Sequence, residues 1–339
     1  MPTAKMDRRS WCQTLGWLLA CWSVLAVAVE PERRNPGEWL RMLGEAMQHL
    51  DYRATVVYTR DNRIQTLRLT HRIEDGVIHE HLQTLNDPLR EVIREAGKVT
   101  CYFPERRTIV VESRNLPPSL FGEWSDQRQQ QTEYYRLALG RQGHEAGRAA
   151  QEIVIEPADS YRYGRRIWVD RDSKLPLKLE LLNRNGEVLE AIVVTELGVG
   201  GVEEETSSGI VPEGATEHWK VLTRKEEPAE RRWRLAQLPP GFQTVRHSRR
   251  VDPIDAKPID HILITDGLGS VSVYIKQQDA DDEEFDPGKL RLGAVNVYNK
   301  RIDGYLVTVL GDVPPETVRL IGDGVQADET DPVDISDTP

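Results

Sequence analysis

Cysteine is scarce in this chain, which has three cysteines among 339 residues. Cys12 and Cys21 lie close to the N-terminus, so removal of that region would leave Cys101 alone. A chain with one cysteine forms no internal disulfide, and its hydrophobic core must hold the fold without one. Cys101 stands in an apolar run beside Tyr102, which is typical of a buried, inert thiol rather than of a nucleophile.

The chain also has no excess of positive charge. The formal net charge is −11, which argues against nucleic acid or an anionic membrane surface as a bulk electrostatic target. The chain also has no G-x-S-x-G nucleophile motif, no P-loop and no H-E-x-x-H zinc motif. The sequence therefore predicts a protein that is not an enzyme and that uses no cofactor.

Metal-binding patterns are absent as well. His71, His79 and His81 form the most suggestive group, in a hairpin that should turn at Asp75-Gly76. That register puts His71 on the opposite face of the sheet from the other two. A site with only two histidine ligands would be weak. We therefore expect no metal site, and we expect these histidines to be solvated.

What the chain does have, in its first thirty residues, is the pattern of an export signal. Arg8-Arg9 precede the apolar run Trp11–Val29, and Ala26–Ala28 fits the small-x-small rule of signal peptidase. We therefore expect residues 1–28 to be a signal peptide. Two alternatives stay open: a membrane anchor, because about 20 apolar residues span a bilayer, and a lipoprotein box at Leu18–Cys21.

Strand patterns dominate the rest of the chain. One amphipathic helix comes first, with Asn35 as its N-cap followed by proline. Runs of alternating apolar and polar residues then follow over 52–112 and 151–202, which predicts one long antiparallel meander. The segment 115–140 interrupts this meander with apolar anchors and a helix expected around 126–139.

The clearest hairpin lies at Ser173–Val194. Leucines at every second position from 175 to 181 give one strand an apolar face. Asn185-Gly186 predicts a two-residue type I′ turn, in which both residues have positive φ. This turn places Leu179 opposite Ile192 and thereby sets the register of the two strands.

The pattern divides the chain into two domains. An acidic segment rich in glycine and serine, without periodicity, is expected to be a linker over 204–227. A large β domain (32–203) precedes it and a small α+β domain (228–325) follows. Residues 326–339 are expected to be a disordered acidic tail.

Two surfaces are candidates for binding. The first is an arginine patch in the small domain, formed by Arg231, Arg232, Arg234, Arg249 and Arg250. Arginine pairs bidentately with carboxylates, so the patch either docks an acidic peptide or is solvated surface. Adjacent strand residues point to opposite faces. Of Arg249 and Arg250, at most one should therefore make the central contact, while the other is solvated or braces the fold.

The second candidate is a cavity enclosed by the meander. Apolar side chains of the helix and of the segment 115–140 either line this cavity or fill it completely. The candidate lining residues are Trp39, Leu43, Met47, Leu116, Leu120, Phe121 and Trp124.

Several segments resemble one family, the MucB/RseB family of periplasmic sigma-E regulators. They are YGRRIWVDRDSKLPLKLELLNRNGEVLE (Tyr163–Glu190), LPPGF (Leu238–Phe242), HSRR (His247–Arg250) and TDGLGSVSVYI (Thr265–Ile275). The order of signal peptide, large β domain, linker and small C-terminal domain is similar too. The resemblance covers Asn35 to about Gly324.

The resemblance implies a fold, a partner and a ligand. The large domain would be a half-open barrel like that of the lipoprotein carrier LolA, with helices in its concave side, so the leucine face of the hairpin should point inward. The small domain would dock on the periplasmic domain of a transmembrane anti-sigma factor of the MucA/RseA type and shield it from site-1 proteolysis. A lipid or a lipopolysaccharide fragment would release it.

The expected function is thus that of a periplasmic, non-enzymatic negative regulator of the envelope-stress sigma factor. The alternative is a LolA-like periplasmic carrier of lipids or lipoproteins. No nucleic acid is expected as a partner, and a homodimer stays open. A lipid would be recognised mainly by its methylenes, each worth about 0.8 kcal/mol. Filling the cavity with Leu43→Trp should therefore weaken release by lipid and leave partner binding unchanged.

Overall fold

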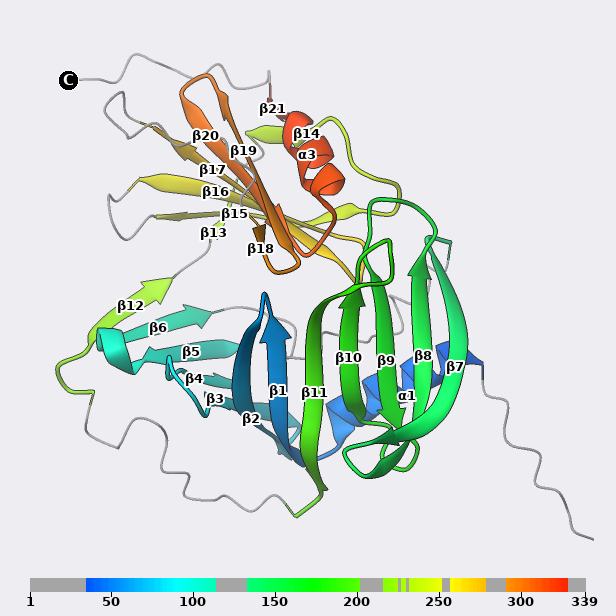
Figure 1. The fold of residues 1–339 in the computed structure, drawn as a ribbon. Coiled ribbons are helices and arrows are strands. Elements are labelled where there is room, and N and C mark those ends of the chain that lie inside the picture. The colour runs from blue at the N-terminus through cyan, green and yellow to red at the C-terminus, as the bar shows by residue number, and fades with distance from the viewer. Residues whose placement is uncertain are drawn as a thin grey trace, which may run out of the picture. The chain divides into compact units, whose positions relative to one another are not determined.

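The computed structural model describes residues 35–113, 133–201, 216–224, 227–229, 232–251, 257–278 and 291–328. These residues form a twelve-stranded sheet, a seven-stranded sheet and a two-stranded ribbon (Figure 1). Nearly all strand pairs are antiparallel, and helices are few, so the predicted α+β, mainly antiparallel fold class is confirmed. Among these residues, no helix is long and apolar enough to cross a membrane.

The twelve-stranded sheet has the strand order β12-β6-β5-β4-β3-β2-β1-β11-β10-β9-β8-β7. Its strands are β1 (Tyr52–Arg60), β2 (Arg63–Glu74), β3 (Val77–Thr84), β4 (Glu91–Glu95), β5 (Lys98–Phe103), β6 (Thr108–Ser113), β7 (Tyr135–Glu145), β8 (Arg148–Pro157), β9 (Gly164–Asp170), β10 (Pro176–Leu182), β11 (Val188–Val199) and β12 (Lys220–Arg224). The end strands β7 and β12 do not pair with each other, so the barrel is half open as expected.

Helix α1 (Pro36–His49) packs against one face of this sheet (Figure 1). The Glu38 backbone N–H donates to the Asn35 side chain at 2.8 Å, which confirms the predicted N-cap. The apolar face of the helix joins a core that also contains Ile153, Ile167 and Leu177. The core of the large sheet is thus built around this buried face of α1.

The hairpin β10–β11 has the expected register, with Leu179 opposite Ile192, and Leu177 is fully buried in the core. The predicted turn type is wrong. The Asn183 N–H donates to the Glu187 carbonyl at 2.9 Å, so the loop contains three residues, and only its last one, Gly186, has positive φ (+79°). The Asn183 side chain accepts from two backbone N–H groups of the loop, and these bonds stabilise the longer turn.

The segment before the hairpin also differs from expectation. Strand β7 begins at Tyr135 and pairs with β8, so the helix expected around 126–139 is wrong over 135–139. Apolar residues at 135, 137 and 139 follow the period of two that a strand requires. The remainder of that predicted helix, 126–132, lies outside the described residues.

Strand β12 lies inside the segment 204–227 that is expected to be a linker. It pairs in parallel with β6, from Lys220 opposite Thr108 to Arg224 opposite Glu112. A strand at a sheet edge gains backbone hydrogen bonds without needing an apolar pattern, and such a strand leaves little trace in sequence periodicity. Residues 220–224 of the expected linker thus form an edge strand of the large sheet.

The seven-stranded sheet has the order β13-β15-β16-β17-β20-β19-β18, and helix α3 (Pro315–Asp323) covers one face. Its strands are β13 (Glu227–Pro228), β15 (Gln243–Val251), β16 (Pro258–Thr265), β17 (Ser270–Gln277), β18 (Arg291–Leu292), β19 (Val295–Ile302) and β20 (Tyr305–Gly311). The ribbon pairs β14 (Trp233–Leu235) with β21 (Val325–Ala327). The core under α3 includes Val273, Val309 and Ile321.

A buried ion pair joins the β8–β9 connection of the large sheet to the β16–β17 connection of the small sheet, and both sheets belong to one compact unit. Arg162 Nε lies 2.6 Å from Asp266 Oδ2, and both side chains are almost fully inaccessible to solvent. The Tyr135 hydroxyl donates to the same oxygen at 2.7 Å. Burial, with the Asp266 charge second, raises the pKa of Tyr135 well above its usual value, so this hydroxyl keeps its proton.

Candidate partner-binding and ligand-binding sites

Arg249 is engaged inside the small sheet. On β15 it lies opposite Asp260 of β16, with Nε 2.8 Å from Oδ1 and Nη2 3.0 Å from Oδ2. Trp233 Nε1 donates to the same carboxylate at 3.1 Å, and Asp260 is buried. Arg249 therefore braces the fold, which is one of the two roles left open for it.

Arg250 lies on the other face of the sheet, away from α3. Its guanidinium carbon is 4.9 Å from the centre of the Tyr274 ring. Tyr274 in turn stacks on His261, with ring centres 4.4 Å apart. The His261 Nε2 atom is 3.0 Å from the Ser272 hydroxyl. Arg250 is thus half-buried, with its guanidinium held over an aromatic ring.

The remaining arginines of the predicted patch are surface residues. Arg232 and Arg234 are exposed on either side of buried Trp233. Because Trp233 and Arg249 bind the same carboxylate, the structure brings these two sequence clusters together. Arg231 lies outside the described residues.

The predicted cavity residues on α1 are packed rather than lining open space. Trp39, Leu43 and Met47 are all buried in the core of the large sheet. Leu43 has no exposed surface, and the Lys174 ammonium lies 4.9 Å from the centre of the Trp39 ring. Of the two alternatives for α1, lining a cavity or filling it, the packing of these residues favours filling. The other four candidates, Leu116, Leu120, Phe121 and Trp124, lie outside the described residues.

An apolar stripe that the sequence reasoning missed crosses the same face of the sheet beyond α1. It consists of one residue from each of five neighbouring strands: Leu82, Val92, Cys101, Val110 and Leu222. Leu82 pairs with core residue Leu69, so the stripe continues the core toward the open end of the barrel. All of these side chains except Val110 are partly exposed. The stripe becomes visible only when the register between the strands is known, because each strand contributes a single residue to it.

Ion pairs border this apolar stripe on one side. Two residues away along these strands, on the same face, are Glu80, which pairs with Arg94, and Glu112, whose carboxylate lies 2.8 Å from Arg224 Nη1. A charged row beside an apolar row suits an amphipathic molecule. The apolar part of such a molecule can pack on the apolar stripe while its polar part contacts the ion pairs.

The three histidines of β2 and β3 do not converge. The register places His71 on the opposite face from His79 and His81, as predicted. The expectation of solvation is wrong for His71, which is buried against the Tyr52 ring and whose pKa is lowered by this burial. His81 Nε2 lies 2.5 Å from Glu91 Oε1. Within the described ranges, no group of three potential metal ligands occurs.

Comparison with known proteins gives two family matches. The model of the MucB/RseB N-terminal domain matches residues 35–216, and that of the MucB/RseB C-terminal domain matches residues 227–326. The chain is 30% identical over 321 residues to the sigma factor AlgU regulatory protein MucB of Pseudomonas aeruginosa, covering 91% of this chain and 96% of that protein. It is 27% identical over 296 residues to the sigma-E factor regulatory protein RseB of Escherichia coli K12, covering 86% and 90%.

Solved structures show the same likeness. The complex structure of Pseudomonas aeruginosa MucA/MucB matches with a TM-score of 0.68 and 28% identity, covering 86% of this chain and 99% of that chain. A crystal structure of MucB matches with a TM-score of 0.64 and 28% identity, covering 86% and 98%. The fold is thus similar across most of the length of both chains.

Proposed function

This chain belongs to the MucB/RseB family, and we propose from this membership that it is a non-enzymatic negative regulator of an envelope-stress sigma factor. It binds the periplasmic domain of a transmembrane anti-sigma factor and shields it from site-1 proteolysis. The observation that carries the proposal is the similarity, over both sheets, to sigma factor regulatory proteins, one of which has been solved as a MucA/MucB complex. The export pattern at 1–28 supports a periplasmic location for the mature chain.

The test is a protection assay with the purified mature chain and an anti-sigma periplasmic domain. Cleavage of that domain by the site-1 protease should slow in proportion to the fraction bound. A pull-down from envelope extract that recovers assorted lipoproteins, without protection in the assay, would instead favour the carrier function.

The arginine patch is our candidate for the docking surface. The protein is acidic overall, so an acidic segment of a partner is attracted only where positive charge is concentrated. Arg250, with its charge on the Tyr274 ring, is the central contact. Exposed Arg232 and Arg234 flank Trp233, which packs with Arg249 on the opposite face of the sheet, so they form a separate part of the patch. Arg249 contributes indirectly, because it fixes Asp260 and the strand that carries Arg250.

We expect Arg250→Glu to abolish protection of the anti-sigma domain. Reversing a charge whose partner carboxylate is buried costs about 2–5 kcal/mol of binding free energy. The thermal midpoint should stay nearly unchanged, because the cation–π interaction between Arg250 and the Tyr274 ring stabilises the fold by only about 0.5–1 kcal/mol. Binding should also weaken with added salt.

The matched control is Arg184→Glu, the same charge change at an exposed turn of the large sheet, which should bind like the parent chain. Arg249→Glu should behave differently from Arg250→Glu. It places a carboxylate against buried Asp260, so it should lower the thermal midpoint first. Salt-independent binding together with normal protection by Arg250→Glu would show that the patch is ordinary surface.

We further propose that a lipid acyl chain binds along the apolar stripe of β3–β6 and β12 rather than at α1. The stripe is partly exposed, continuous across five strands and bordered by ion pairs, whereas the described candidates on α1 are buried. Such a ligand releases the anti-sigma factor only if it binds the free regulator more tightly than the complex.

Val92→Thr should weaken binding of a fluorescent fatty acid such as cis-parinaric acid. The substitution keeps the shape and the strand preference but buries a hydroxyl without a partner, at a cost of about 1–3 kcal/mol. The affinity should therefore fall about fivefold or more. Ile93→Thr, the next residue on the opposite face, is the control and should bind the probe normally. Equal losses in both variants would place the acyl chain elsewhere.

A further inference from the structure

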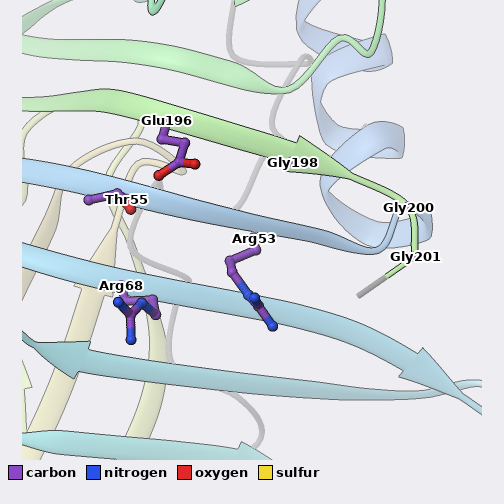
Figure 2. A pocket seen from close by; sticks show the side chains of 7 residues that line it. All are labelled: Arg53, Thr55, Arg68, Glu196, Gly198, Gly200 and Gly201. Carbon is purple, nitrogen blue, oxygen red and sulfur yellow. The ribbon is translucent and has the colours of Figure 1, made fainter. Parts of the chain in front are cut away.

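A pocket of about 380 Å³ lies on the outer face of the large sheet, where strands β2, β1 and β11 run side by side (Figure 2). Ala54 and Val56 point into the core, so Arg53 and Thr55 between them point outward. The pocket is in the size range of about 300–1,000 Å³ that is usual for small-ligand sites. The lining residues are Arg53, Thr55, Arg68, Glu196, Gly198, Gly200 and Gly201.

Opposite charges stand on two sides of this pocket. Thr55 is directly opposite Arg68 on one neighbouring strand and Glu196 on the other, and Figure 2 shows its side chain between theirs. With strands about 4.8 Å apart, the backbones of Arg68 and Glu196 are separated by roughly 10 Å. Both side chains are exposed, and neither has a hydrogen-bond or ion-pair partner in the part of the chain that the structure describes.

One end of the pocket is formed by two glycines, which carry no side chains. Gly200 and Gly201 have φ of +75° and +58°, a conformation that other L-residues rarely adopt. A Cβ atom at either position would meet nothing within 4 Å. These two glycines therefore leave open space beside the pocket where a side chain would otherwise stand.

The charges decide what kind of ligand fits. A simple anion is attracted by Arg53 and Arg68 but repelled by Glu196, and a simple cation meets the reverse problem. An acidic peptide is disfavoured for the same reason. A molecule that carries a phosphate and an ammonium group a few bonds apart satisfies both sides, because guanidinium groups match phosphate oxygens and a carboxylate accepts hydrogen bonds from an ammonium.

We propose that this pocket binds a phosphoethanolamine group, with its phosphate between Arg53 and Arg68 and its ammonium on Glu196. The Thr55 hydroxyl lies between these charges and hydrogen-bonds to the phosphate. The site is on the face of the sheet opposite the apolar stripe, so it is separate from the acyl-chain site and does not depend on the regulatory function. The group can come from a free phosphoethanolamine compound or from a phospholipid headgroup.

The test is calorimetric titration of the mature chain with O-phosphoethanolamine, phosphocholine and inorganic phosphate. A charge-assisted hydrogen bond to Glu196 should favour phosphoethanolamine over both other compounds by about tenfold or more, since the trimethylated nitrogen of phosphocholine cannot donate. Glu196→Gln should remove this preference without weakening inorganic phosphate. Arg68→Gln should weaken all three compounds, and Arg184→Gln should change none.

The source is distinguished by co-sedimentation with vesicles of phosphatidylethanolamine and phosphatidylcholine, against vesicles of phosphatidylcholine alone. Binding to the first kind only, lost in Glu196→Gln, identifies the lipid headgroup. Binding of the soluble compound without binding to vesicles identifies a free ligand, and either result supports the site. Equal affinity of the parent chain for inorganic phosphate and phosphoethanolamine would overturn the proposal, as would a preference that persists in Glu196→Gln.

Discussion

Replacing Arg162 by alanine is expected to lower the free energy of unfolding by about 3–5 kcal/mol, because the change leaves Asp266 as a buried, uncompensated charge. Arg162 and Asp266 are almost completely inaccessible to solvent. The guanidinium also lies 4.6 Å from the ring centre of Tyr134 and 5.0 Å from that of Phe242, and alanine cannot replace either cation–π interaction. Urea unfolding followed by tryptophan fluorescence measures the effect.

The control is Arg136→Ala, which removes an exposed arginine whose Nε is 4.0 Å from Glu156 Oε2. Both side chains of that pair are mostly exposed, so the change should cost less than about 1 kcal/mol. Because the Arg162 pair joins residues of the two sheets, its removal should also separate their unfolding into two steps. A single transition at the midpoint of the parent chain would mean that this ion pair contributes little.

The second large effect is expected at α1. Leu43→Ala should cost about 2–5 kcal/mol, the range for a leucine removed from a packed core. Leu43 has no exposed surface and is surrounded by the core of the large sheet. Gln48→Ala, at an exposed position of the same helix, should leave stability unchanged or slightly raised, since alanine favours helices. Thermal and urea unfolding of both variants provide the comparison.

The same packing changes what a larger residue would do at this position. With an open cavity beside α1, Leu43→Trp would fill space and weaken lipid release selectively. In a core without space, overpacking costs about 1–3 kcal/mol or more of stability. We therefore expect Leu43→Trp to lower the unfolding midpoint. If Leu43→Trp is as stable as the parent chain and loses only lipid binding, space for a ligand does exist beside α1.

Local patterns predicted the parts of this fold that local chemistry decides. Asn35 caps the helix because its side chain reaches the Glu38 N–H. Alternation predicted the apolar face of β10, and the expected turn at Asn185-Gly186 predicted the register of β10–β11. The turn between them could not be predicted from Asn185-Gly186, since the Asn183 side chain adds two hydrogen bonds that favour a three-residue loop.

Features formed by segments that are distant in the chain could not be predicted from local sequence patterns. The apolar stripe is visible only once five strands are in register, and each strand contributes a single residue to it. The roles of Arg249 and Arg250 were predicted to differ, because neighbours on a strand point apart. Which of them braces the fold depended on the position of Asp260 on the next strand. Arg162 gave no signal at all, since its carboxylate partner is 104 residues away.

Strand β12 limits how far the small sheet can travel. It ends at Arg224, and β13 of the other sheet begins at Glu227, so three peptide units connect the two, at most about 11 Å of extended chain. A pulling force on the small sheet therefore reaches the large sheet through β12 when the other contacts between the sheets give way. Once direct contacts between the two sheets, such as the Arg162–Asp266 pair, have broken, the backbone bonds of β12 to β6 and the Arg224–Glu112 pair carry the tension. The strength of the pairing between β12 and β6 thus sets the force at which the chain between the two sheets lengthens.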